Sequence, residues 1–331
     1  MSFLKKILQI CILLALLAGA GLVFWAGQPI RSGAQNVPFT IEPGSHLRSA
    51  ADQIAAAGIP VNAALLALLA RLTGQADKIK AGSYELKPGA TPNMLIRQMV
   101  RGEFAQESLV IIEGWTFKQM RAAVAAHPNL KHDTIDLTDV QLLAKISTEA
   151  KHPEGLFFPD TYLFAKGASD LQVYRQANTA LMAHLNEAWS KRDASLPYET
   201  PYQALIMASI VEKETGKKED RNTIASVFIN RLKAGMMLQT DPTVIYGMGE
   251  RYDGNIRKSD LQTDTAYNTY TRKGLPPTPI ALPGAESLQA ALEPVATDAL
   301  YFVARGDGSS QFSSNLDDHN RAVNKYIRGG N

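Results

Sequence analysis

The sequence predicts an α+β chain with one N-terminal transmembrane helix, a small βααβ domain and a larger mixed α+β domain. Three observations support this architecture. The segment 7–26 is apolar and uncharged, short strand-like and helix-like segments alternate over 39–104, and a nearly all-apolar helical segment after residue 200 leads into polar, proline-rich loops. We therefore expect a cytoplasmic tail at 1–6, a transmembrane helix at 7–27, a tether at 28–38, the small domain at 39–104 and the larger domain at 105–328.

The first apolar segment has the length and the flanks of a membrane-spanning helix. At about 1.5 Å per residue, 7–26 crosses the roughly 30 Å hydrocarbon layer of a bilayer. Lys5 and Lys6 precede it, so the N-terminus is expected to stay in the cytoplasm. A cleaved signal peptide is the alternative, but its apolar core usually has only about 7–15 residues. The segment is therefore interpreted as an uncleaved, single-pass anchor that leaves the bulk of the chain outside the cytoplasm.

Composition narrows the classes of partner and cofactor. The 34 basic and 32 acidic residues give a net charge of +2, which argues against nucleic acid as a partner. Cys11 is the only cysteine and lies in the apolar segment, so the exported part has no disulfide and depends on its hydrophobic core. The six histidines are scattered and none lies in a His-Glu-x-x-His frame. The sequence therefore predicts no metal site and no cofactor.

The small domain carries a first, limited resemblance. Strands are expected near 39–41 and 81–86, and helices near 45–57, where Ser45 is a plausible N-cap, and 60–72. The stretch IEPGSHLRSAADQI resembles a LysM-type module, which grips the N-acetyl groups of glycan chains. This resemblance implies a LysM-like βααβ domain. A spacer domain without glycan affinity is the alternative reading.

Two glutamates lie at the end of the apolar helical segment YQALIMASIVEKET. Between residues 204 and 211 only Ser209 is polar, which is typical of a buried helix. At about 100° per residue, Glu212 and Glu214 point about 200° apart and cannot form a facing pair. Glu214 continues an apolar stripe, and burial there would raise its pKa toward ~6–7, which suits a general acid. The alternative is that both side chains reach solvent at the helix end.

Polar loops after this segment supply candidate binding residues. An amphipathic helix, RNTIASVFINRLKAG, is followed by two stretches dense in amides, hydroxyls, carboxylates and tyrosines. Neutral hydrogen-bonding side chains interleaved with tyrosines are typical of carbohydrate sites. The candidates for binding substrate are Gln239, Thr240, Asp241, Tyr246, Tyr267, Asn268 and Tyr270. Asp241 could equally cap a helix.

Four stretches in order resemble the endolytic murein transglycosylase (YceG-like) family: ASIVEKET, ASVFINRL, LQTDPTVIYG and TAYNTYTRKGLPPTPI. The resemblance covers nearly all of 1–328 and is most specific over 208–303. It implies that 105–328 is a YceG-like catalytic domain on the periplasmic side of a bacterial inner membrane. Its catalytic glutamate maps to Glu214, which Thr215 follows. The link to Glu219 and Asp220 departs from the family's usual "SER" triplet, which we interpret as loop variation.

The resemblance also implies a reaction and a set of partners. The family cleaves the MurNAc–GlcNAc bond of nascent glycan strands without water, leaves 1,6-anhydroMurNAc ends and so ends glycan elongation. Glu214 would act first as general acid and then as base, with Glu212, Thr215, Asn230 and Arg231 in support. Arg231 is expected to pair with a carboxylate inside the fold. The partners would be peptidoglycan strands, the inner membrane and, as candidates, peptidoglycan synthases of the penicillin-binding type.

Two alternatives to this function stay open on the sequence. One is a hydrolytic muramidase in which Asp241 serves as the partner carboxylate of Glu214. The other is a non-catalytic scaffold that binds glycan for the cell-wall machinery. The first would leave reducing ends instead of anhydro ends, and the second would show no turnover.

Overall fold

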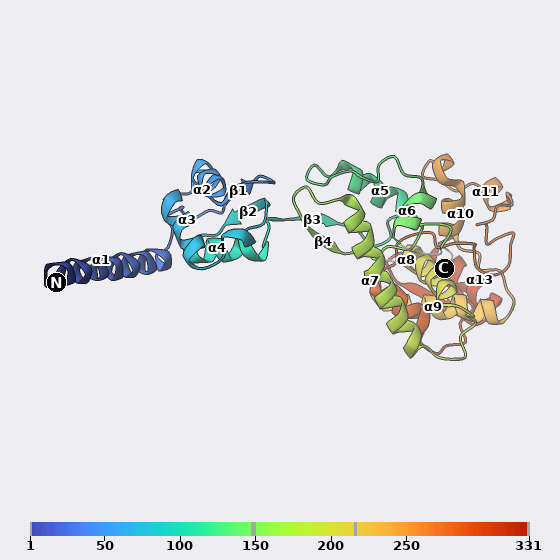
Figure 1. Ribbon diagram of the computed structural model, residues 1–331. Helices are drawn as coiled ribbons and strands as arrows, with labels where there is room; N and C mark the ends of the chain where they lie inside the picture. The colour runs from blue at the N-terminus through green and yellow to red at the C-terminus, as the bar shows by residue number, and fades with distance from the viewer. Residues whose placement is uncertain (1, 147–149, 215–216, 330–331) are drawn as a thin grey trace. The chain divides into compact units, whose positions relative to one another are not determined.

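The computed structural model describes residues 2–146, 150–214 and 217–329. These residues form two compact units (Figure 1). The first unit consists of Met1–Glu107 with Leu163–Ala168, and the second of Ser108–Tyr162 with Ser169–Asn331. The mixed α+β class with one N-terminal apolar helix, expected from the sequence, is confirmed.

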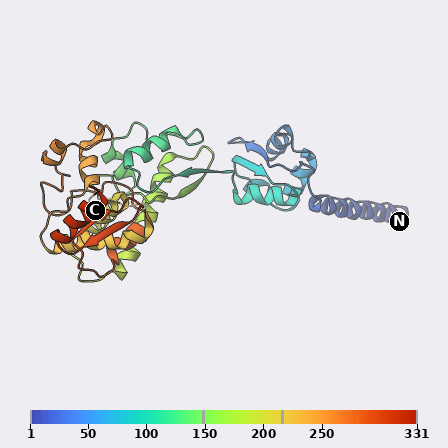
Figure 2. The same ribbon diagram turned by 180° about the vertical axis from the view of Figure 1, so that it is seen from behind.

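The first unit is a long apolar helix followed by a βααβ segment and one further helix. Its elements are α1 (Ser2–Gly27), β1 (Val37–Ile41), α2 (Leu47–Ala56), α3 (Ala63–Leu72), η1 (Ala76–Lys78), β2 (Gly82–Leu86) and α4 (Pro92–Arg101). β1 and β2 lie side by side (Figure 2) and pair antiparallel. Phe39 lies opposite Tyr84, and the two rings stack at 5.3 Å between centroids. Tyr84 is fully buried, and its hydroxyl donates to the Lys80 carbonyl at 2.6 Å. The paired rings therefore form the centre of this core.

One detail of the first unit differs from the expectation. The N-cap of α2 is His46 and not Ser45. The Ser45 hydroxyl instead accepts a hydrogen bond from Nε2 of Gln53 at 3.0 Å. A side chain two turns into the helix thus ties down the preceding turn and displaces the predicted cap.

Helix α1 is the one helix among the described residues that is long and apolar enough to cross a membrane. Its last turn does not end freely. Ala26 and Ile30 are buried in the core of the first unit, and Leu22 and Trp25 pack against that core. The Ile30 amide also donates to the Ala90 carbonyl at 2.8 Å. Part of the segment expected as a tether is therefore bound to the small domain.

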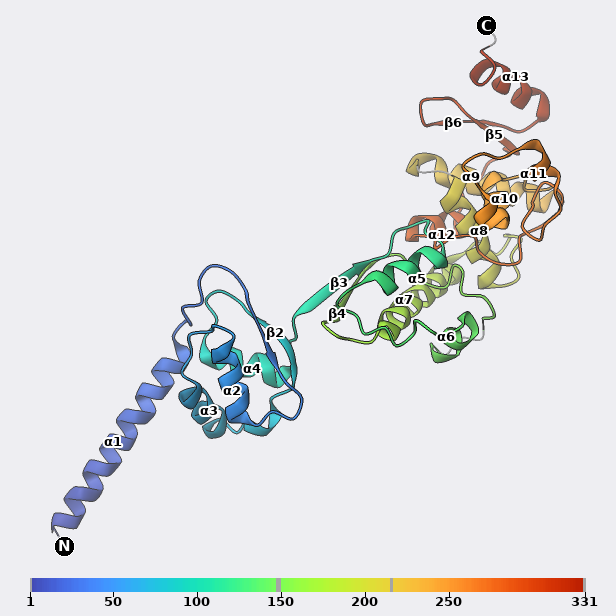
Figure 3. The ribbon, with the colours of Figure 1, turned by 90° about the horizontal axis from the view of Figure 1, so that it is seen from above.

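The second unit is mainly helical. Its helices are α5 (Phe117–Ala126), α6 (Asp139–Lys145), α7 (Asp170–Lys191), α8 (Pro201–Glu214), α9 (Lys218–Lys233), α10 (Asp241–Met248), η2 (Gly249–Arg251), α11 (Lys258–Gln262), α12 (Ala285–Leu292) and α13 (Leu316–Tyr326). Its strands β5 (Tyr301–Ala304) and β6 (Ser310–Ser313) pair with each other. The residues of the paired strands β3 (Gln106–Val110) and β4 (Thr161–Ala165) are divided between the two units. Figure 3 shows α13 beside the β5–β6 hairpin, which it contacts.

Helix α8 is the centre of the second unit. It contacts α7, α9, α10 and α12, and every residue from Ala204 to Val211 is buried. Burial on all sides explains why the segment is apolar all round. Its polar member, Ser209, donates to the Ile206 carbonyl at 2.7 Å and accepts from the Ile280 amide at 3.0 Å. This hydroxyl fixes a long loop to the central helix.

We predict that Ser209→Ala destabilises the protein by about 1–3 kcal/mol, because the buried Ile280 amide loses its acceptor. Ser190→Ala is the matched control, since the Ser190 hydroxyl also donates to a carbonyl one turn back but is exposed. Its effect should stay within about 0.5 kcal/mol. Denaturant unfolding of both variants measures the difference, and equal losses would contradict the role given to Ser209.

Candidate active site

Glu214 is the last residue of α8, the point at which the buried helix reaches the polar loops. Its side chain is only partly exposed, and its Oε2 accepts a hydrogen bond from the Thr240 hydroxyl at 2.6 Å. The structure therefore brings together two residues that the sequence places among the candidates, although 26 positions separate them.

Thr240 is held in place by a network of buried threonines. It occupies the N-cap of α10, but its side chain makes no cap hydrogen bond, because the hydroxyl donates to Glu214 instead. Its amide donates to the Thr269 hydroxyl at 3.1 Å, and its carbonyl accepts from the Thr243 hydroxyl at 2.8 Å. The hydroxyls of Thr243 and Thr269 lie 2.9 Å apart. With all three threonines buried, the donor that faces Glu214 has little freedom to turn away.

The groups around Glu214 shift the pKa of its carboxyl in opposite directions. Burial raises the pKa of its carboxyl above the ordinary value, and the nearby negative charge of Asp241 adds to the increase. The hydrogen bond from Thr240 and the positive charge of Arg231 act the other way, because both favour the ionised form. The net effect is a raised pKa, as the apolar stripe in the sequence predicts. A carboxyl with a raised pKa keeps its proton to higher pH than an exposed carboxyl does, which suits a general acid.

Arg231 differs from the expectation. It was predicted to pair with a carboxylate, but its buried guanidinium donates to backbone carbonyls: Nε to Leu300 at 2.7 Å and Nη1 to Leu238 at 2.8 Å. Backbone carbonyl oxygens therefore take the place of the expected carboxylate. The positive charge of Arg231 still acts on Glu214 through space and lowers the pKa of its carboxyl. Its Nη1 also lies 3.4 Å from Oε1 of Gln239.

Gln239 and Asp241 flank Thr240 and are both exposed. Gln239 has a φ of 52°, the left-handed region that a residue other than glycine rarely adopts. Strained backbone of this kind occurs often at functional sites. Asp241 is the first residue of α10 and not its N-cap, so the capping alternative does not hold in that form. Its Oδ1 accepts from the Tyr270 hydroxyl at 2.6 Å.

A second buried carboxyl lies at the other end of α10. The Tyr246 hydroxyl donates to Oε2 of Glu154 at 3.0 Å, and the Phe117 amide donates to Oε1 at 2.8 Å. Glu154 is 3% exposed, and burial raises its pKa to about 7. Tyr246 packs edge-to-face on Tyr267 at 4.9 Å. The one local signal for Glu154 is a carboxyl in the otherwise apolar stretch PEGLFFP, because its partners Phe117 and Tyr246 lie far away in the sequence.

Three of the sequence candidates make contacts inside the fold. Asn268 is buried, and its amide donates to the carbonyls of Asp260, Leu261 and Thr263. Oε2 of Glu212 accepts from the Gly284 amide at 3.0 Å and the Ser287 hydroxyl at 2.7 Å, at the N-terminus of α12. The Asn230 amide donates to the carbonyls of Thr297 and Ala299. These three residues hold the loops and helices around the site in place. Thr215, which the sequence also predicts in a supporting role, lies outside the described residues.

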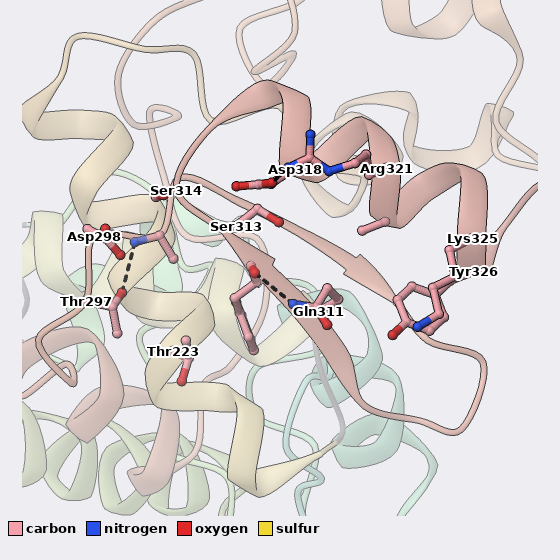
Figure 4. Close-up of a pocket in the computed structure, with 13 residues that line it drawn as sticks. Thr223, Thr297, Asp298, Gln311, Ser313, Ser314, Asp318, Arg321, Lys325 and Tyr326 are labelled. Atoms are coloured by element: carbon pink, nitrogen blue, oxygen red, sulfur yellow. Dashed lines mark hydrogen bonds and ion pairs between the residues drawn. The ribbon is translucent and has the colours of Figure 1, made fainter.

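A separate cleft of about 560 Å³ lies between α9, β6 and α13 (Figure 4). The charged and aromatic residues in its lining are Asp298, Phe312, Asp318, Arg321, Lys325 and Tyr326. Neither Glu214 nor its hydrogen-bond donor Thr240 belongs to this lining. The molecule thus has a charged cleft in addition to the neutral, hydroxyl-rich surroundings of Glu214.

The fold and the site together define a protein with an apolar N-terminal helix and a partly buried carboxyl among hydroxyl, amide and tyrosine side chains. Residues 39–325 match the model of the YceG-like family, and the chain belongs to that family. It is 35% identical over 285 residues to the endolytic murein transglycosylase of Bacillus subtilis (strain 168), covering 77% of this chain and 75% of that protein.

Two further relatives support the same assignment. The endolytic murein transglycosylase of Streptococcus pneumoniae serotype 2 (strain D39 / NCTC 7466) is 28% identical over 87% of this chain, which spans 58% of that longer protein. The crystal structure of a YceG-like protein from Listeria monocytogenes superimposes with a TM-score of 0.54 at 32% identity, covering 87% of this chain and 99% of that one. The fold described above is therefore that of the family.

We predict that Thr240→Val moves the basic limb of the pH–rate profile to higher pH. The change removes a donor that favours the ionised carboxylate, so the pKa of Glu214 rises further and the protonated form persists at higher pH. Valine keeps the volume at this buried position. The profile of turnover against pH for both proteins is the measurement, and a limb that stays in place or moves to lower pH would contradict the assignment of the limb to Glu214.

Proposed function

We propose that this protein is an endolytic murein transglycosylase that cuts the MurNAc–GlcNAc bonds of nascent peptidoglycan strands without consuming water. Membership of the YceG-like family and the names of its relatives support the activity. The observation that carries the mechanism is the partly buried Glu214 carboxyl with a raised pKa, hydrogen-bonded to Thr240.

One carboxyl group serves twice in this reaction. Protonated Glu214 donates its proton to the glycosidic oxygen as the bond from that oxygen to C1 of MurNAc breaks. The carboxylate then accepts the proton of the MurNAc 6-hydroxyl, whose oxygen bonds to C1 and closes the 1,6-anhydro ring. The proton returns to Glu214, and no water enters the balance. The substrate's own N-acetyl group can shield the positive charge that develops at C1.

The surroundings of Glu214 suit both halves of this cycle. Burial and Asp241 favour the protonated form that begins the reaction. The Thr240 hydroxyl and the Arg231 charge stabilise the carboxylate that exists between the two proton transfers. With burial and Asp241 alone, Glu214 would release its proton too reluctantly. With the Thr240 hydroxyl and the Arg231 charge alone, it would stay ionised. The opposition between them therefore fits a single acid–base residue.

The sugar-binding role falls to the exposed and half-exposed candidates. Gln239, Asp241, Tyr246, Tyr267 and Tyr270 all retain accessible surface. Gln239 and Asp241 flank Thr240, Tyr246 lies in α10, and Tyr267 and Tyr270 lie on the segment that carries Thr269. Thr240 and Arg231 act on the acid, whereas Asn230, Asn268 and Glu212 position the backbone. The small domain, as a LysM-like module, would hold the strand. The chain would act from the periplasmic side of the inner membrane, beside the synthases that extend the strand.

The hydrolytic alternative remains a matter of product chemistry. It requires Asp241 to activate a water molecule, but Oδ1 of Asp241 is engaged by the Tyr270 hydroxyl at 2.6 Å. Mass spectrometry of the glycan fragments distinguishes the two reactions. Anhydro ends are expected here, and reducing ends produced in their place would favour the muramidase.

The sharpest prediction separates two glutamates two positions apart. Glu214→Gln keeps the shape of the side chain but removes the titratable proton, so cleavage of glycan strands should fall by several orders of magnitude. The thermal midpoint at neutral pH should hold or rise. A raised pKa in the fold means that Glu214 favours the folded state most below its unfolded pKa, and that this contribution is lost as the pH rises.

The matched control for this prediction is Glu212→Gln. Glu212 contacts the N-terminus of α12, so its replacement should leave most of the turnover, or reduce turnover only together with the thermal midpoint. The assignment of the acid is wrong if a folded Glu212→Gln protein is inactive while Glu214→Gln is active. Full activity in both variants would show that neither glutamate is the acid, whereas only an absence of turnover in the parent protein would favour the scaffold reading.

A further inference from the structure

We propose that the leucine face of α3 rests in the headgroup layer of the membrane that α1 spans, so that the small unit is seated on the lipid surface. The proposal rests on α1 as the anchor and not on the reaction at Glu214. Its ligand is the boundary between lipid headgroups and acyl chains on the side where α1 leaves the bilayer.

Helix α3 is apolar on both its inner and its outer face. It buries Leu66, Ala67, Leu69 and Ala70 in the core of the first unit. Leu65, Leu68 and Leu72 nevertheless remain 36%, 43% and 69% exposed. Spacings of three and four residues place these three leucines on one face of the helix. In water such a face has no partner, whereas an amphipathic helix at a membrane surface buries it among the acyl chains.

The first unit brings this face to the membrane by its attachment to α1. Helix α1 contacts both α3 and α4, and Ala26 and Ile30 are part of the core that α3 helps to form (Figure 1). Three residues after the end of α1, the Ile30 amide donates a backbone hydrogen bond to the Ala90 carbonyl. The domain therefore begins where the apolar helix ends, with no free chain between them, and α3 lies within contact of the residues that leave the bilayer.

Trp25 and Arg71 fit the depth that this arrangement requires. Trp25 lies in the last turns of α1 and packs against the core of the small unit, and tryptophan is enriched at the level of the headgroups. Arg71 is exposed in the last turn of α3 beside Leu72, where its long side chain can reach lipid phosphates. Met94, 55% exposed on α4, adds a further apolar side chain on the second helix that contacts α1.

The test uses the full chain in lipid nanodiscs with Cys11→Ser, which removes the one native thiol. A bimane probe is attached at Leu68→Cys, and nitroxide-labelled lipids serve as the quencher. The matched control is Asp52→Cys, an exposed position on α2. Both sites are on the surface, so neither change should disturb the core.

The expected result is quenching at position 68 at least several-fold stronger than at position 52. Equal quenching at both positions would overturn the proposal, because it would leave α3 no nearer to the lipid than an ordinary surface helix. Shielding of the probe at position 68 from water, without quenching by the labelled lipids, would instead assign the leucine face of α3 to a protein contact. That result would also overturn the proposal.

A second inference concerns the charged cleft of Figure 4 and rests on the proposed function. We infer that this cleft binds the peptide stem of the glycan strand. Its volume of about 560 Å³ is in the range of sites that bind ligands of a few residues. Arg321 forms an ion pair with Asp318, and Lys325 and Asp298 supply a further positive charge and a further carboxylate in the lining. A peptide stem carries both carboxylates and an amine, whereas the backbone sugars offer mainly neutral groups.

The wall of this cleft is tied to the surroundings of Glu214 through α9. Asn230 donates to the carbonyls of Thr297 and Ala299, two residues of the cleft lining. The next residue, Arg231, binds the Leu300 carbonyl and, on its other side, the Leu238 carbonyl ahead of Gln239 and Thr240. One fixed stretch of backbone therefore connects the charged cleft with the loop that carries the donor to the acid.

The test compares two substrates: glycan strands that keep their peptides and strands from which an amidase has removed them. Lys325→Ala and Arg321→Ala should each raise KM for peptide-bearing strands by about tenfold, leave kcat unchanged and leave turnover of peptide-free strands unchanged. Arg328→Ala, an exposed cation just beyond α13, is the control and should match the parent on both substrates.

Equal effects on both substrates, or no effect on either, would overturn the peptide assignment. Absence of turnover on every substrate with the parent protein would instead count against the proposed function, so the two failures are distinguishable.

Discussion

The arrangement of the larger unit follows from a carboxyl group at the end of a fully buried helix. Helix α8 is covered by four other helices, and its last residue, Glu214, cannot be fully solvated. A buried carboxyl without a partner is costly, so the fold supplies the Thr240 hydroxyl. That hydroxyl in turn needs a fixed backbone, which Thr243 and Thr269 provide. The loops around the site are thus organised around a single hydrogen bond.

The two glutamates of α8 show how one helix can serve both structure and chemistry. Glu212 satisfies the amide and hydroxyl at the N-terminus of α12, where a negative charge also suits the helix dipole. Glu214 accepts the hydrogen bond of the Thr240 hydroxyl and lies in the field of Arg231, while burial favours its protonated form. The difference in their roles comes from what packs against each face of the helix. The chemistry of the two side chains is the same.

In the two further inferences, different parts of the chain bind the membrane and different parts of the substrate. A small unit seated on the lipid surface by α3 would hold the start of the exported chain at the membrane, where nascent strands are extended. A cleft for peptide stems would orient the strand relative to the acid, because Asn230 and Arg231 hold the cleft wall and the acid's loop to the same helix. Recognition of lipid, peptide and sugar would then occupy three separate surfaces, and each has the polarity of its ligand.

Local patterns in the sequence determined the elements of this protein. The uncharged apolar run, the βααβ rhythm and the all-apolar segment around Ser209 predicted α1, the small unit and the central helix, because periodicity and burial are read from neighbouring residues. The apolar stripe also predicted a raised pKa for Glu214, and burial in the fold acts in that direction. The tertiary structure alone decided the partners. Thr240 faces Glu214 instead of capping its helix, Arg231 binds carbonyls instead of a carboxylate, and Glu154 meets Tyr246 across 92 positions. Such contacts depend on how distant segments pack, and no local pattern encodes them.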